Sequence, residues 1–283
     1  MSSGVLFSEE RRVRILELIR ERKKVTVHEL CQSLQASPAT VRGDLRDLDR
    51  EGLLVRTHGG ALEKSRTSFE QVSSNRSTVN MEAKRAIAVR ARPLVEDGDT
   101  ILLDTGTTTL EVAYLLKSCD RLTVVTNDLE IARALEDAIG VQVVLLGGVL
   151  RPGYRCTVGP ASIRMAQDLR VDKALMATNG LSLESGATTP DLQQAEIKRA
   201  MIAIARKVIF VCDSSKIGRE SFARFAGLEQ LDVLITERLA DDDRQRFEAY
   251  DIEVIVAGPS NERPVAASIQ THGKPSPGES LPR

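Results

Sequence analysis

The apolar residues of the first fifty positions recur at the spacing of amphipathic helices. Ile15, Leu18 and Ile19 share one face of a helix that is predicted to begin near Ser8. A second helix is predicted to open at residues 26–29, whose sequence Thr-Val-His-Glu matches a capping box. Only two residues follow it before the next helical pattern, so a third helix must follow at a sharp angle.

That third helix carries the most informative pattern of the chain. Ser37 is a favourable N-cap and Pro38 suits the first helical position. Val41, Leu45 and Leu48 are spaced i, i+4, i+7, which predicts that they face a core. The residues that this leaves toward solvent are Ala39, Thr40, Arg42, Gly43, Arg46 and Asp47.

A small β-wing is predicted after the three helices. Residues 53–55 are typical of a strand, which residues 56–58 extend to a Gly59-Gly60 turn. A helix-turn-helix with such a wing can place its last helix in the major groove of DNA and its wing on the backbone. Arg42 and Arg46 lie one turn apart, and a guanidinium suits a guanine edge or a phosphate. The candidate DNA-contacting residues are Ser37, Ala39, Thr40, Arg42, Gly43, Arg46, Arg56 and His58.

Two plainer readings stay open for this region. A helix with two arginines and two aspartates outside is often only a solvated face, and His58 could be a structural turn residue. The preceding helix pair and the following wing favour DNA binding. The net charge of −1 gives no support by itself, so DNA binding has to be argued from where the charges sit.

The second half of the chain follows a different pattern. After a polar stretch that is expected to be a linker, residues 81–95 form a predicted helix, and apolar runs then alternate with helical segments. Alternating strands and helices predict an α/β fold with a doubly wound, mainly parallel sheet. The predicted strands span residues 100–103, 122–126, 141–146, 173–177, 208–212, 233–236 and 253–256. The last 25 residues hold five of the ten prolines, and we expect them to be disordered.

Polar motifs follow five of these predicted strands, where ligands bind in such sheets. Residues 104–109 form a hydroxyl-rich turn that leads into a helix and predicts an anion cradle. Ordinary capping and turn chemistry is the alternative for any single motif. Glu196 and Lys198 could belong to a solvated helix face. Lys216 follows a predicted strand and is the better candidate for a phosphate or a sugar hydroxyl. The candidate ligand-binding residues are Asp104, Thr105, Gly106, Thr107, Thr108, Thr109, Thr126, Asn127, Gly147, Gly148, Asn179, Gly180, Glu196, Lys198, Asp213 and Lys216.

Composition excludes several other classes of protein. No apolar run approaches the ~20 residues of a membrane span, and the start lacks the features of a signal peptide, so we expect a cytoplasmic protein without a membrane partner. Aromatic residues make up 3%, which argues against stacking on single-stranded nucleic acid. The four cysteines are scattered without a CxxC pair, so we expect no metal site, no disulfide framework and no cofactor.

Residues 8–62 resemble the winged helix-turn-helix of the DeoR family of bacterial regulators, and residues 81–257 resemble its effector domain. The matching motifs are Glu10-Arg11-Arg12, Ser37 to Leu48, Arg56-Thr57-His58-Gly59-Gly60-Ala61, Asp104-Thr105-Gly106-Thr107-Thr108, Thr126-Asn127, Gly147-Gly148, Asn179-Gly180-Leu181-Ser182, Ala195-Glu196-Ile197-Lys198-Arg199 and Asp213-Ser214-Ser215-Lys216. The resemblance implies a fold related to ribose-5-phosphate isomerase and a phosphorylated sugar as inducing ligand. Three positions depart from the family pattern: Gly43 stands where a second arginine is common, Thr105 replaces a frequent Ser, and Gln194 replaces a frequent Glu.

These observations predict a ligand-controlled transcriptional regulator. The expected organisation is a DNA-binding domain over residues 1–62, a linker over 63–80, a sensing and oligomerisation domain over 81–257, and a tail over 258–283. The leading hypothesis is a repressor of a sugar-utilisation operon that binds double-stranded operator DNA as a homodimer or homotetramer and is released by a sugar phosphate. One alternative is a sugar-phosphate isomerase-like enzyme that uses Asp104, Glu196 or Asp213 with Lys216. Another is that the second domain only oligomerises.

Overall fold

The computed structural model describes residues 8–22, 24–50, 53–57, 59–63 and 78–258. His58, most of the predicted linker and nearly all of the predicted tail lie outside these described residues. The predictions made for them therefore stay predictions.

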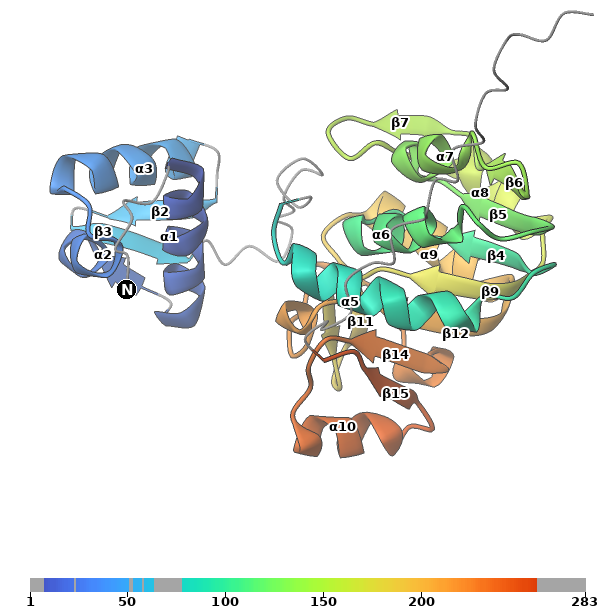
Figure 1. Cartoon of the computed structure of the whole chain (residues 1–283). Coiled ribbons are helices and arrows are strands. Elements are labelled where there is room, and N and C mark those ends of the chain that lie inside the picture. The colour runs from blue at the N-terminus through green and yellow to red at the C-terminus, as the bar shows by residue number, and fades with distance from the viewer. Residues whose placement is uncertain (1–7, 23, 51–52, 58, 64–77, 259–283) are drawn as a thin grey trace, which may run out of the picture.

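The N-terminal domain consists of three helices and a small antiparallel sheet (Figure 1). Its elements are α1 (Ser8–Arg22), β1 (Lys24–Thr26), α2 (Val27–Leu34), α3 (Pro38–Arg50), β2 (Leu54–Thr57) and β3 (Gly60–Glu63). The predicted capping box is present, because the Thr26 hydroxyl accepts from the Glu29 backbone N–H while Glu29 accepts from the Thr26 backbone N–H. The three helices and the wing are confirmed. Strand β1 was not predicted; it pairs with β3 and completes the order β1-β3-β2.

The second domain is built on a seven-stranded parallel sheet with the order β15-β14-β12-β9-β4-β5-β6. All seven predicted strands belong to it, and this confirms the predicted fold class. Their bounds are β4 (Thr100–Leu103), β5 (Leu122–Thr126), β6 (Val141–Leu145), β9 (Val171–Met176), β12 (Ala205–Val211), β14 (Val233–Thr236) and β15 (Glu253–Val256).

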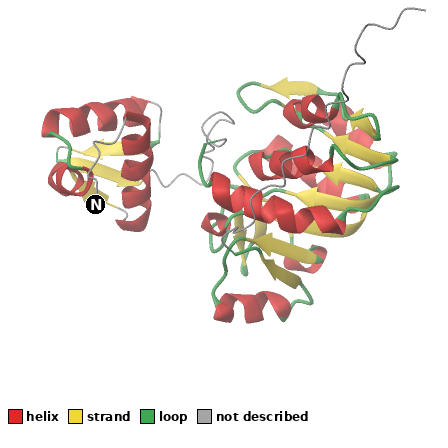
Figure 2. Ribbon diagram, viewed as in Figure 1, coloured by secondary structure: helices red, strands yellow, loops and turns green. Residues whose placement is uncertain are grey.

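Helices cover both faces of this sheet, as Figure 2 shows. The buried residues of α5 (Met81–Ala91), α6 (Thr107–Leu116) and α7 (Leu129–Leu135) join one apolar cluster with side chains of the central strands. Those of α8 (Pro160–Gln167), α9 (Leu192–Ala203) and α10 (Asp241–Glu248) join a second cluster with the alternate strand residues. The alternation follows from the two-residue period of a strand. Three short 3-10 turns complete the helical elements: η1 (Arg92–Leu94), η2 (Ser214–Lys216) and η3 (Leu228–Gln230).

The strand order reverses between β4 and β9. From β4 the chain runs outward through β5 to β6, then returns to the other side of β4 with β9 and continues outward to β15. In open α/β sheets, the crevice beyond the carboxyl ends of the strands at such a reversal is where ligands bind. The topology therefore directs attention to the segments that follow β4 and β9.

Five short strands outside the main sheet were not predicted. The hairpin of β7 (Val149–Arg151) and β8 (Cys156–Val158) follows β6, and β10 (Gly180–Ser182), β11 (Gly186–Thr189) and β13 (Ala223–Ala226) form an antiparallel sheet. The hairpin and the small sheet both begin just after a strand of the main sheet ends, so they flank the edge formed by the carboxyl ends of its strands. No helix in the described part of the chain is long and apolar enough to span a membrane.

Candidate functional site

Asp44 and Asp47 of α3 are both held by arginines of α1. Asp44 is buried and receives hydrogen bonds from the Arg11 guanidinium, with Nη2 of Arg11 at 3.1 Å from Oδ1 of Asp44. Asp47 pairs with Arg12 at 2.5 Å. The hydrogen bond to Asp44 is the main cause of the raised pKa of Arg11, so this pair stays charged. The expectation that both aspartates lie outside is wrong for Asp44, because α1 packs against that side of α3.

This pairing leaves the arginines on the outer side of α3 available. Arg42 and Arg46 are both exposed, and within the described residues neither is paired with a carboxylate. Ser37 caps the helix by accepting from the Thr40 backbone N–H at 3.2 Å, and its hydroxyl lies 2.8 Å from that of Thr40. Ala39 is also exposed. The exposed side of α3 therefore carries two arginines that have no carboxylate partner among the described residues.

Gly43 lies on the same outer part of α3. A β-carbon built at this position would meet no atom within 4 Å, so packing inside the domain does not require a glycine. Arg56 of the wing is exposed, and its backbone N–H donates to Asp49 at 3.3 Å. The predicted contact residues that the structure describes thus all lie on α3, at its N-cap or on the wing, and all except the half-buried Gly43 are exposed.

Two pockets meet at the segment that follows β9. The first, which we call the Lys216 pocket, has a volume of about 610 Å³ that includes space open to solvent. The second, here the Arg151 pocket, encloses about 300 Å³ measured in the same way. Residues 177–179 line both pockets. This is the edge of the sheet to which the reversal of strand order points. The side chains that define the two pockets come from several elements: Asn80, Lys84, Gly106, Thr107, Thr108, Asp213 and Lys216 for the first, and Thr105, Arg151, Tyr154, Cys156, Gln194 and Lys198 for the second.

The N-terminus of α6 opens into the Lys216 pocket. Gly106 is the N-cap, and a β-carbon there would approach that of Ala177 to 2.9 Å, so a larger residue would crowd the wall between β4 and β9. Thr107 and Thr108 contribute the first backbone N–H groups, which have no carbonyl partner within a helix. Lys84 and Lys216 add positive charge to the same pocket. A helix N-terminus with two lysines is a favourable site for a phosphate group.

Asp213 holds the polar side of this pocket in place. Its carboxylate accepts from the Asn80 amide at 2.9 Å, from the Ser215 backbone N–H at 3.2 Å and from the Ser215 hydroxyl. Burial by itself would raise the pKa of Asp213, but the Lys216 charge, these hydrogen bonds and the Lys84 charge together lower it. Asp213 is therefore ionised at neutral pH, and its charge attracts both lysines of the pocket.

Lys198 and Asp104 form a buried ion pair behind the wall that the two pockets share. The side chain of Lys198 is 4% exposed and that of Asp104 is fully buried. The Lys198 ammonium also donates to the Ala177 carbonyl at 3.0 Å, and Asp104 accepts from the backbone N–H groups of Thr105 at 2.8 Å and Ala177 at 2.9 Å. The alternative of a solvated helix face is wrong for Lys198, because α9 is buried along more than one stripe between α8 and β13. Since the pair fixes residue 177, it shapes both pockets.

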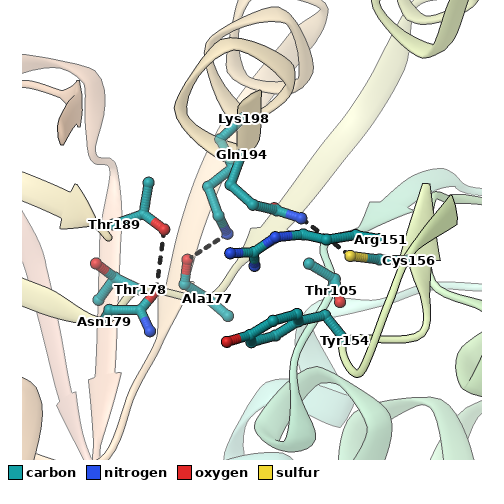
Figure 3. Close-up of a pocket in the computed structure, with 10 residues that line it drawn as sticks. All are labelled: Thr105, Arg151, Tyr154, Cys156, Ala177, Thr178, Asn179, Thr189, Gln194 and Lys198. Atoms are coloured by element: carbon teal, nitrogen blue, oxygen red, sulfur yellow. Dashed lines mark hydrogen bonds between the residues drawn. The ribbon is translucent and has the colours of Figure 1, made fainter. Parts of the chain in front are cut away.

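The Arg151 pocket is formed mainly by residues that sequence reasoning missed (Figure 3). The Arg151 guanidinium lies 3.7 Å from the centre of the Tyr154 ring and pairs with Asp191 at 3.4 Å. Cys156 comes from β8, and burial raises the pKa of its thiol to about 11, so the thiol is neutral at pH 7. The hairpin of β7 and β8 brings these side chains opposite α9.

Several predicted ligand residues line neither pocket. The buried Asn127 donates to the Thr157 carbonyl at 2.8 Å, and the Thr126 hydroxyl accepts from the Asp128 N–H at 3.1 Å. The Thr109 hydroxyl donates to the Gly106 carbonyl at 2.8 Å. The other residues in this group are Gly147, Gly148, Gly180 and Glu196.

Close packing or exposure explains the positions of these four residues. A β-carbon at Gly148 would lie 2.2 Å from the Ser162 hydroxyl, and one at Gly180 would lie 2.5 Å from the Arg219 carbonyl, so both glycines allow close approach within the fold. Gly147 accepts from the Ser162 hydroxyl. Glu196 lies on the exposed side of α9 and contributes to neither pocket.

A carboxylate and a hydroxyl link the sheet edge behind the pockets. The Thr105 hydroxyl donates to Asp128 at 2.6 Å, and Asp128 caps α7 by accepting from the Glu130 and Ile131 N–H groups. Burial raises the pKa of Asp128, which these hydrogen bonds partly offset. Within the described residues, no cluster of three or more His, Cys, Asp or Glu residues has an arrangement that could hold a metal ion.

Comparison with known families agrees with the two-part architecture. Residues 11–67 match the DeoR-like helix-turn-helix domain, and residues 79–238 match the DeoR C terminal sensor domain. The chain belongs to the DeoR family. As a member of that family it is a DNA-binding transcriptional regulator with a sensor domain.

Relatives of this DeoR-family chain extend over almost its whole described length. It is 38% identical to the HTH-type transcriptional regulator GlpR of Haloferax volcanii, over 87% of this chain and 96% of the relative. It is 37% identical to the transcriptional repressor GlcR of Bacillus subtilis, over 83% and 90%, and 31% identical to a putative aga operon transcriptional repressor of Escherichia coli O157:H7, over 88% and 94%.

Solved structures resemble the fold of this chain at low identity. Ribose 5-phosphate isomerase A of Methanocaldococcus jannaschii is 17% identical with a TM-score of 0.37, over 49% of this chain and 55% of that chain. The delta subunit of eIF2B from Chaetomium thermophilum is 16% identical with a TM-score of 0.39, over 82% and 73%.

Proposed function

We propose that this DeoR-family regulator represses a sugar-utilisation operon and leaves its operator when a phosphorylated sugar binds. The observation that carries DNA recognition is the division of charge on α3. Asp44 and Asp47 are held by Arg11 and Arg12 of α1, whereas Arg42 and Arg46 are exposed and have no carboxylate partner among the described residues. A recognition helix contacts base edges with residues of its N-terminal half, where Arg42 lies, and Arg46 follows one turn later on the same side. The names of the repressors from B. subtilis and E. coli support the direction of control.

The Lys216 pocket supports control by a phosphorylated sugar. It combines the N-terminal N–H groups of α6 with Lys84 and Lys216, and its continuation past residues 177–179 offers room for a carbon chain. Winged-helix regulators bind repeated half-sites as symmetric oligomers. We therefore propose a homodimer or homotetramer in which sugar binding changes the geometry of the DNA-binding domains.

The same geometry favours a sensor over an isomerase. A catalytic carboxylate has to reach a substrate proton. Asp104 is fully buried and accepts hydrogen bonds from Thr105, Ala177 and Lys198. Asp213 has a lowered pKa and is held by Asn80 and Ser215, while Glu196 lies outside both pockets. None of the three carboxylates that sequence reasoning offered for proton transfer is free to perform it, so we propose that the protein is not an enzyme.

The DNA-binding part is tested by in vitro selection of a DNA site followed by affinity measurement. Arg42→Ala should weaken binding to the selected site by about 1–3 kcal/mol and relax preference at one base pair if Arg42 contacts a base. Arg14→Ala is the matched control, because Arg14 is a half-exposed arginine of α1 that pairs with Glu17 at 2.8 Å. Equal affinity of Arg42→Ala and the wild-type protein would contradict the assigned role of α3.

A further inference from the structure

One buried polar atom in the Arg151 pocket has no partner. Gln194 of α9 is 2% exposed and lines this pocket. Its Nε2 donates to the Cys156 sulfur at 2.9 Å, whereas its Oε1 has no hydrogen-bond partner among the described residues. A buried polar atom without a partner costs free energy comparable to its lost hydration. A ligand in the pocket would remove that cost.

One polar atom of Gln194 lacks a partner whichever way its side-chain amide is turned. The Cys156 thiol is protonated at neutral pH because burial raises its pKa to about 11. A thiol can accept from the Gln194 amide nitrogen or donate to its oxygen. In either orientation one polar atom of Gln194 is satisfied by Cys156 and the other is left facing the pocket. A hydroxyl group can donate and accept, so it completes the site in both cases.

The other groups of the pocket indicate a neutral partner. Its two cations already have anionic partners, since Arg151 pairs with Asp191 at 3.4 Å and Lys198 pairs with Asp104. Gln194 adds no charge, and the hydroxyls of Thr178 and Thr189 lie on the same lining. None of the described residues that line the pocket carries a carboxylate, so an ammonium group on a ligand would have no counter-charge there. The pocket is therefore suited to the hydroxyl groups of a carbon chain.

The position of the pocket relates Gln194 to the phosphate site. Residues 177–179 form a common wall, with the α6 N-terminus and Lys216 in one pocket and Gln194 in the other. We propose that Gln194 is a specificity-determining residue that hydrogen-bonds to a neutral hydroxyl group of a sugar whose phosphate lies at the α6 N-terminus. This inference rests on the proposed function, and it adds that the chain selects neutral sugar phosphates over amino-sugar phosphates.

The inference is tested with the full chain and three variants at neighbouring positions. Gln194→Leu removes the hydrogen-bonding atom, and Gln194→Glu adds a charge that favours an ammonium group. Gln193→Glu is the matched control, since Gln193 precedes Gln194 on the same helix and is exposed. The probes are a set of neutral hexose and pentose phosphates, glucosamine 6-phosphate and inorganic phosphate. Dissociation constants come from calorimetry, and unfolding temperatures confirm that each variant is folded.

The wild-type protein should bind at least one neutral sugar phosphate more tightly than glucosamine 6-phosphate. Gln194→Leu should weaken that binding by about tenfold while inorganic phosphate binds as before. Gln194→Glu should shift the preference toward glucosamine 6-phosphate, and Gln193→Glu should change nothing. If both Gln194 variants bind the sugar phosphates with wild-type affinities and in the same order of preference, the inference is overturned while the proposed function stands. Absence of binding of every sugar phosphate to the wild-type protein would overturn the proposed function together with it. If the Leu variant does not fold, the Glu variant decides.

Discussion

Lys198→Met should destabilise the sensor domain severely, because it removes one partner of a buried ion pair. Methionine keeps most of the aliphatic volume, so the loss is chiefly electrostatic. The Lys198 side chain is 4% exposed, and its ammonium bonds both Asp104 and the Ala177 carbonyl. The variant leaves the fully buried Asp104 carboxylate without a counter-charge. Breaking such a pair from one side costs about 3–5 kcal/mol.

The loss should be visible as a fall of about 6–20 °C in the unfolding temperature of the sensor domain, measured by calorimetry. Lys207→Met is the control, because Lys207 is 42% exposed and pairs with Glu253 at 3.7 Å, where an ion pair is worth about 0–1 kcal/mol. The double variant Asp104→Asn with Lys198→Met should be more stable than Lys198→Met alone, since it removes the unpaired charge. A single variant within about 0.5 kcal/mol of the wild-type protein would refute the reasoning.

Two further predictions concern Gly43 and Cys156. Gly43→Ala should stabilise α3 by about 1 kcal/mol, because the β-carbon of the alanine would meet no atom within 4 Å. Hydrogen exchange of the α3 amides should then slow about fivefold. Faster exchange in the variant would show that the fold requires the glycine. Burial raises the pKa of Cys156 from 9.0 to about 11, so the neutral thiol contributes to the stability of the folded state. This contribution should be present below pH 9 and lost between pH 9 and 11, because the thiol of the unfolded chain ionises first. Urea unfolding at these pH values should show a smaller loss for Cys156→Ala than for the wild-type protein, and equal losses would contradict the cause assigned to the shift.

The main sheet could be predicted because its central strands are mostly buried on both faces and therefore mostly apolar. Each of the seven is a run of at least four residues, most of them apolar, between polar turns. The strands that were missed, such as β7, β8 and β10, have three residues each, too few for a periodic signal. Arg151 and Tyr154 stand on or beside this hairpin, so the pocket that they line could not be seen from the pattern.

The candidate site was predictable where its residues follow strands that the sequence predicts. Residues directly after β4, β9 and β12 do line the pockets, as the strand-end rule expects. Lys198 was misplaced because one helical stripe was assumed for α9, which packs on several sides. Lys84 carried a usable signal: it precedes Ile87, Ala88 and Ala91 by three, four and seven residues, which puts a charge on the apolar face of α5.

The central claim is that a phosphorylated sugar bound at the sheet edge weakens DNA binding by α3. The most direct measurement is the affinity of the full chain for a selected DNA site. Fluorescence anisotropy gives this affinity with and without each sugar phosphate of the set. At least one sugar phosphate should lower the affinity by about 5–150-fold, and the corresponding unphosphorylated sugar should have no effect. DNA affinity that is the same with every sugar phosphate, in a protein that binds one of them, would contradict the account.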